Sequence, residues 1–146
     1  MHLIFDLDGT LANIEHRVHL IQGAQKRWPA FYRACVGDTP NEAICETLRL
    51  YAAQANHHIE VWSGRSDEVR DLTEAWLAKQ GLSYRRLRMR RAKDYRQDSI
   101  VKEEWLNAFV GEFGKVPDLV FDDRAQVVAM WRSRGVMCAQ VGDGEF

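Results

Sequence analysis

The stretch FDLDGT, from Phe5 to Thr10, decides the fold that this sequence predicts. The apolar run Leu3 to Phe5 leads into two aspartates two residues apart, and a glycine and a threonine follow. Residues i and i+2 of an extended strand share a face, so Asp6 and Asp8 should project together at the strand's carboxyl end. In open parallel sheets, ligands bind in the crevice at that end. The stretch therefore predicts an acidic site at a strand end.

The rest of the chain alternates between strand and helix patterns. Helical patterns are predicted at about 40 to 56, 66 to 81, 99 to 113 and 124 to 134, and Thr39 to Glu42 with Pro40 predict a capping box at the first of these. This alternation favours right-handed βαβ crossovers, with a parallel sheet between helices. The predicted strands are Leu3 to Phe5, Ile59 to Trp62, Leu82 to Met89, Leu119 to Phe121 and Val136 to Val141.

The segment from 13 to 38 fits this rhythm least well. Its apolar residues are sufficient for one or two short helices, so it is either a small cap over the site or a long crossover. A chain of 146 residues has the size of one domain, and we expect a single domain over 1–146 with a possible small cap at 13–38.

Composition excludes several classes of protein. The chain is 46% hydrophobic and 28% charged, which argues against disorder. Its three cysteines lack zinc-site spacing, so we expect free thiols. Neither an export signal nor an apolar run of membrane-spanning length is present, so we expect a cytoplasmic location and no membrane contact. The net charge of −1 means that attraction to polyanions must come from local clusters.

The acidic pair itself predicts a Mg²⁺ site. Two crowded carboxylates repel each other unless a cation lies between them, and oxygen ligands suit Mg²⁺. Gly9 allows a sharp turn, and Thr10 offers a hydroxyl to a phosphate oxygen. The alternative is an Asx-type turn that merely ends the strand.

Two further motifs follow predicted strands. In WSGR, from Trp62 to Arg65, the Ser63 hydroxyl, the amides around Gly64 and the next helix N-terminus suit a phosphate, and Arg65 can take two of its oxygens.

In FDDR, from Phe121 to Arg124, the carboxylates of Asp122 and Asp123 would complete a metal site. Lys102, on the preceding helix, offers a cation to the same place.

In order and spacing, FDLDGT, SGR, Lys102 and DD resemble the four motifs of the haloacid dehalogenase (HAD) superfamily of phosphohydrolases. Around VKEE, and over FDDRAQVVAMWRSRGVMCAQV from Phe121 to Val141, the chain is also similar to the 3′-phosphatase domain of bacteriophage polynucleotide kinase. The resemblance covers essentially the whole chain. It implies an α/β fold, a HAD-like Rossmannoid three-layer sandwich with a central parallel sheet and a small helical cap insertion. It also implies aspartyl-phosphate chemistry on a phosphorylated nucleic acid or nucleotide.

The resemblance assigns roles to individual residues. Asp6 would be the nucleophile, Asp8 the general acid and base, and Lys102 the balancing cation. Asp6, the backbone carbonyl of Asp8, and Asp123 would hold Mg²⁺, with Asp122 as a direct or indirect ligand. The residues implied to contact the phosphate or the substrate are Thr10, Arg17, Ser63, Gly64, Arg65, Arg90 and Asp98.

A basic segment, RRLRMRRAKDYR at 85–96, carries seven basic residues and one aspartate. If it is a strand, Arg86, Arg88 and Arg90 share one face of a sheet edge. They either attract a nucleic-acid backbone or protect the edge from aggregation. Tyr95 or Trp28 would be available to stack a base.

The leading hypothesis is a stand-alone 3′-phosphatase acting on DNA, RNA or 3′-nucleotide ends, and the resemblance implies a repair or phage-encoded end-healing role. Since GxxxxGK[ST] is absent, a kinase activity would reside on another chain, and a separate kinase or ligase chain is an expected partner. The alternatives are a small-molecule nucleotidase with the same chemistry and a non-catalytic module that binds phosphate ends.

Overall fold

A computed structural model describes residues 1–144. Its centre is a parallel sheet of five strands in the order β5-β4-β1-β6-β7, which confirms the predicted parallel sheet. β1, which leads into FDLDGT, is central, and β5, which carries the basic segment, is an edge strand. The strand bounds are β1 His2–Asp6, β4 His58–Ser66, β5 Arg86–Arg90, β6 Leu119–Asp122 and β7 Cys138–Gln140.

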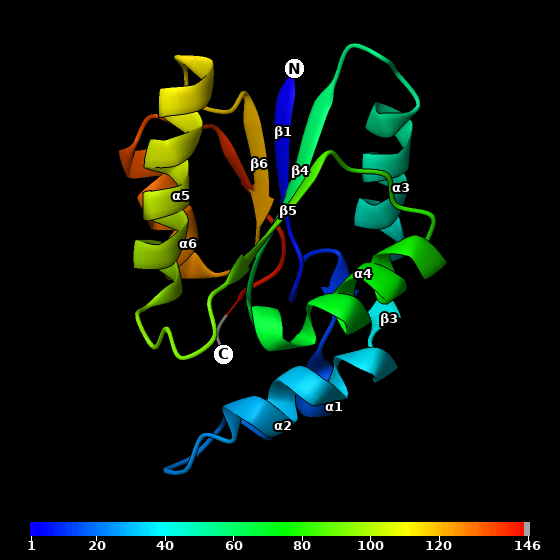
Figure 1. Ribbon diagram of the computed structural model, residues 1–146, viewed down its shortest axis with the longest axis vertical. Coiled ribbons are helices and arrows are strands. Elements are labelled where there is room, and N and C mark those ends of the chain that lie inside the picture. Colours follow the sequence, from blue (N-terminus) through cyan, green and yellow to red (C-terminus); the bar gives the residue numbers. More distant parts are fainter. Residues whose placement is uncertain (145–146) are drawn as a thin grey trace.

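Helices cover both faces of this sheet and make three layers (Figure 1). α3 (Glu42–Ala52) and α4 (Arg70–Lys79) lie on one side, and α5 (Asp98–Phe113) and α6 (Ala125–Ser133) on the other. Successive side chains of β1 point to opposite faces of the sheet and so join two different buried clusters. Leu3 and Phe5 belong to the cluster that contains Leu48 of α3, and Ile4 belongs to the cluster that contains Trp131 of α6.

Two local predictions were wrong. The third predicted strand does not start at Leu82, because residues 82–85 form the exit from α4 and pairing with β4 begins only at Arg86. The predicted capping box does not form either. Thr39–Pro40 is instead the short strand β3, paired antiparallel with β2 (Ala12–Asn13), so α3 starts after Asn41, whose side chain makes no cap hydrogen bond.

The segment between β2 and β3 is helical, as predicted for an insertion. It contains α1 (Glu15–Val18), α2 (Trp28–Arg33) and the 3₁₀ turn η1 (Ala34–Gly37), and the β2/β3 pair closes its base. A small cluster of its own, Ile14, Ile21 and Phe31, holds it together. Figure 1 shows this helical insert beyond the carboxyl edge of the sheet.

A second 3₁₀ turn, η2 (Asp67–Val69), separates β4 from α4, so WSGR lies inside the strand rather than directly before a helix. Over residues 1–144, no helix is both long and apolar enough to cross a membrane.

Candidate active site

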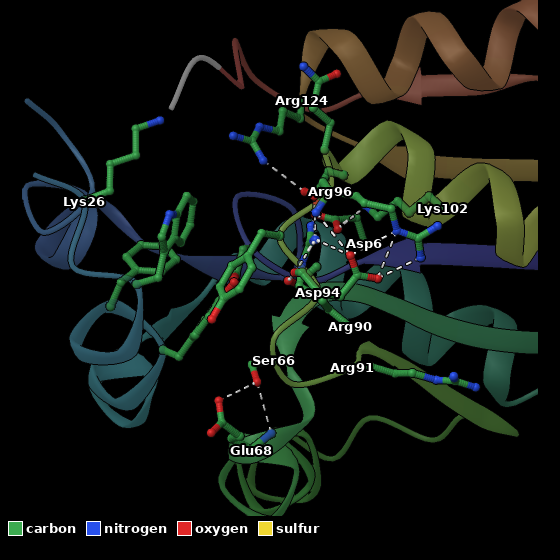
Figure 2. A pocket seen from close by; sticks show the side chains of 18 of the residues that line it. Asp6, Lys26, Ser66, Glu68, Arg90, Arg91, Asp94, Arg96, Lys102 and Arg124 are labelled. Carbon is green, nitrogen blue, oxygen red and sulfur yellow. Dashed lines mark hydrogen bonds and ion pairs between the residues drawn. The ribbon is translucent and has the colours of Figure 1, made fainter. Parts of the chain in front are cut away.

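A pocket of about 550 Å³ opens where the sheet's carboxyl edge meets the helical insert. This volume is within the usual range for small-ligand sites. β1, the turn after it and α5 supply one wall, with Asp6, Asp8 and Lys102, and the insert supplies another, with Trp28 and Tyr32. In Figure 2, Lys26 of the insert and Lys102 lie on opposite sides of this pocket.

Lys102 links the acidic motifs at the pocket floor. Its Nζ donates to Asp6 Oδ1 at 2.6 Å and to Asp122 Oδ2 at 2.8 Å, and all three side chains are buried. Burial alone would lower the pKa of Lys102, but Asp122 and Asp6 outweigh it and raise that pKa above its ordinary value. Lys102 therefore stays charged beside the predicted nucleophile.

The carboxylates of Asp6, Asp122 and Asp123 form a cluster suited to a divalent cation. One oxygen from each lies within 4.8 Å of the others. The three negative charges share one ammonium, that of Lys102, and no Lys or Arg within residues 1–144 forms an ion pair with Asp123. If all three carboxylates are ionised, two negative charges remain unbalanced. Carboxylate oxygens are hard donors, so the cluster fits a Mg²⁺ ion.

Two carboxyl groups of the same cluster have raised pKa values, first because they are buried and then because they lie beside one another. Burial, together with the neighbouring Asp122, raises the pKa of Asp123 to about 7. Burial also raises the pKa of Asp6, because the opposing effect of Lys102 is smaller. A bound cation would favour the ionised form of both groups.

Gly9 allows the turn after β1 to approach this cluster. Its φ of +84° is in the left-handed region, and a Cβ atom there would collide with the Asp123 carboxylate. The glycine of FDLDGT thus serves close packing as well as the turn.

Asp8 is separate from the carboxylate cluster and is held by two arginines. Its Oδ1 accepts from Arg17 Nη2 at 2.7 Å and from Arg65 Nε at 2.9 Å. Burial would raise the pKa of Asp8, but Arg65 and Arg17 outweigh it and lower that pKa. Within the described chain, no hydrogen bond reaches Oδ2, so this oxygen is available to a ligand in the pocket.

Asp38, which the sequence reasoning missed, joins the same network. Its carboxylate accepts from Arg17 and Arg65 at 2.7 Å each and contacts His16, and its side chain is fully buried. It ends the helical insert, and no motif around it signals a site. Arg17 and Arg65 do not line the pocket, so their predicted contact with phosphate stays a prediction, whereas their contacts with Asp8 and Asp38 are direct.

Asp98 forms the side of the pocket next to Gly64. It accepts from Arg90 and from Arg124, the latter at 3.0 Å, and a Cβ on Gly64 would collide with its carboxylate. Burial would raise the pKa of Asp98, but Lys102, Arg124 and Arg90 outweigh it and lower that pKa. Arg90 also donates to the Gly64 carbonyl at 2.8 Å, so this pair ties β5 to the predicted phosphate loop.

Two predicted phosphate ligands are buried and do not line the pocket. The Ser63 hydroxyl accepts from the Arg65 amide at 3.2 Å. Thr10 Oγ1 has no hydrogen-bond partner among residues 1–144. Their contact with phosphate stays a prediction.

The interpretation of the basic strand needs correction. Arg86 pairs with Glu112 at 2.8 Å, and Arg88 lies over the Trp62 ring and 3.4 Å from buried Glu60. Their shared face is turned toward α5 rather than left free for a polyanion. The basic groups of this segment that border the pocket are Arg90, Arg91, Lys93 and Arg96.

Comparison with known families gives the decisive match. A family model described as the polynucleotide kinase PNKP phosphatase domain matches residues 1–146. The chain belongs to this family. The PNKP phosphatase family lies within the HAD-like hydrolases in fold, as the resemblance of the four motifs implied.

Solved structures agree. Two chains from structures of the Pnkp1/Rnl/Hen1 RNA repair complex are 32% and 34% identical, with TM-scores of 0.81 and 0.80. Each match covers 99% of this chain but only 43% or 46% of the other, so the chain spans less than half their length. A HAD-like hydrolase from Streptococcus pneumoniae, 10% identical over 97% of this chain and 86% of its own, has a TM-score of 0.66 and shares the fold.

Proposed function

We propose that this PNKP-family phosphatase domain is a Mg²⁺-dependent phosphomonoesterase that removes 3′-phosphates from nucleic-acid ends. One observation carries the proposal: Asp6 accepts a hydrogen bond from Lys102 and belongs to a carboxylate cluster suited to a divalent cation, while Asp8 lines the same pocket with an oxygen that accepts no hydrogen bond from any other residue of 1–144. This pairs a nucleophile with a separate group that can exchange a proton.

The chemistry divides between the two aspartates. Asp6 attacks phosphorus, the bond to the leaving sugar oxygen breaks, and that oxygen takes a proton from Asp8. The negative charge of the incoming phosphate raises the pKa of Asp8, which its arginines otherwise hold low, so that Asp8 can carry the proton.

In the second half, Asp8 takes a proton from water, the hydroxide attacks the aspartyl-phosphate, and Asp6 is released. Lys102 holds the Asp6 carboxylate in place during both steps. Asp6, Asp122 and Asp123 would hold Mg²⁺, which supplies charge neutralisation for the transferring phosphoryl group.

The nucleic-acid part of the proposal rests on the family and on the rim. Relatives occur in an RNA repair complex, and the pocket is bordered by Lys26, Lys93 and Arg96, which suit a polyanionic strand. The same observations support a role in RNA end repair, together with other repair proteins.

A panel of matched oligonucleotides tests this function. We expect Mg²⁺-dependent release of phosphate from 3′-phosphorylated RNA or DNA but not from 5′-phosphorylated strands, with turnover abolished in Asp6→Asn. Glu74→Gln, which alters an exposed ion pair with Arg70, is the control variant. Hydrolysis restricted to free mononucleotides would support a small-molecule nucleotidase, and phosphate-end binding without any turnover would support a non-catalytic module.

A further inference from the structure

The mouth of the pocket carries aromatic rings on both walls, and the chemistry described above uses neither. Trp28, on the helical insert, and Tyr95, in the loop after β5, both line it. Tyr95 is 86% exposed, so its ring is open to contact with a ligand.

The Trp28 ring is fixed from behind. It stacks on Tyr32 with centroids 5.8 Å apart and meets the edge of buried Phe31 at 5.7 Å. Phe31 in turn lies under the Arg17 guanidinium, at 4.2 Å. The insert therefore presents Trp28 as a supported flat surface rather than as a loose side chain.

The loop that carries Tyr95 is also held, although the ring itself is exposed. Arg90 Nη1 donates to the carbonyls of Asp94 at 3.0 Å and Arg96 at 2.6 Å, on either side of Tyr95. Arg90 also contacts Asp98 in the pocket wall. The position of the Tyr95 backbone is thus fixed relative to the phosphate-binding floor.

Basic groups accompany both rings. Lys26 Nζ lies 5.9 Å from the Trp28 ring centroid, and Lys93 and Arg96 flank Tyr95 in the chain. Aromatic rings next to cations are the combination with which proteins hold single-stranded nucleic acid, because every base has a π face and every linkage a negative charge.

We infer that Trp28 and Tyr95 form a base-binding subsite that takes the unpaired terminal nucleobase of a single-stranded 3′-phosphorylated end. This inference rests on the proposed function and specifies its substrate. A base inside a duplex is stacked on its neighbour and paired, so it must be unpaired or frayed to reach these rings, at a cost of a few kcal/mol. Because stacking supplies the contact, the subsite tolerates all four bases.

The test compares KM and kcat on three ends of one sequence: a single strand with a 3′-phosphate, the same strand with an abasic terminal nucleotide, and a blunt duplex. We expect Tyr95→Ala to raise KM on the single strand by roughly 5- to 150-fold, the range for losing one stacked base, with kcat nearly unchanged. Trp28→Ala should act in the same direction, and Tyr95→Phe should retain wild-type KM. Met137→Ala, another highly exposed residue, is the control.

The abasic end gives the decisive comparison. The wild type should lose at least as much affinity for it as Tyr95→Ala loses for the intact strand, and a variant that combines Trp28→Ala with Tyr95→Ala should lose nothing further. The duplex should be the poorer substrate until its end frays.

Unchanged KM in Tyr95→Ala, or equal turnover of abasic and intact ends, would overturn the subsite while leaving the 3′-phosphatase function in place. Because Tyr95 is so exposed, this variant does not depend on the folding of the insert. If the wild type releases no phosphate from any 3′-end, the proposed function fails instead.

Discussion

Replacing Asp38 with asparagine should destabilise the protein and change its pH profile. In the wild type, the Asp38 carboxylate faces Arg17 and Arg65 with all three side chains fully buried. An amide has only one accepting oxygen, so in Asp38→Asn one guanidinium would meet an NH₂ group and two buried positive charges would be balanced by Asp8 alone. Removing one partner of a buried ion pair typically costs about 3–5 kcal/mol, a large part of a total of about 5–15 kcal/mol.

The measurements are urea denaturation and the pH dependence of kcat. We expect the free energy of unfolding of Asp38→Asn to fall by about 3–5 kcal/mol, whereas Glu74→Gln, at an exposed pair, should change it by at most about 1 kcal/mol. Loss of a negative charge should lower the pKa of Asp8 further, so the alkaline limb of kcat should move to lower pH. An Asp38→Asn protein as stable as Glu74→Gln, with an unshifted limb, would refute this account of the network.

Three further predictions concern the pocket floor. In metal-free protein, burial and Asp122 raise the pKa of Asp123 to about 7, so between about pH 4 and 7 the folded state holds a proton that the unfolded chain releases. The free energy of unfolding should therefore fall as pH rises from about 5 to 7.5. In denaturation curves, Mg²⁺ should abolish that fall, and Asp123→Asn should reduce it, because the pKa of Asp6 is raised as well. Gly9→Ala should weaken Mg²⁺ binding, measured by calorimetry, and should destabilise the fold more than Gly81→Ala does. Both glycines have positive φ, but a Cβ at Gly9 would collide with Asp123, whereas a Cβ at Gly81 would meet open space. Equal losses of stability would contradict the close approach of Gly9 to Asp123. Thr10→Val should raise stability by about 1 kcal/mol, because it removes a buried hydroxyl without a partner, yet lower kcat/KM; unchanged kcat/KM would argue against a phosphate contact.

The sequence predicted the sheet and the acidic floor because these depend on local patterns. Period-two alternation around Phe5 and the position of each acidic pair after a strand were sufficient to bring Asp6 and Asp123 to one edge. Lys102 was assigned from a family motif, and its two short contacts to the cluster agree with that assignment. Its helix was expected from periodicity.

What the sequence did not predict depends on tertiary pairing. Thr39 and Pro40 have the composition of a helix start, but pairing with β2 places them in a strand. Arg86 and Arg88 look like a free basic face, yet Glu60 and Glu112, distant in sequence, neutralise them. Asp38 has no motif, and only the meeting of α1 and β4 gives it two arginine partners.

The network around Asp8 also limits how the helical insert can move. Arg17 comes from α1, Arg65 from β4, and Asp38 bridges them at the end of the insert, so swinging the insert outward would pull a charge away from the proton-transfer group. These ion pairs therefore oppose outward movement of the insert. A substrate would enter a pocket mouth whose shape the network already holds.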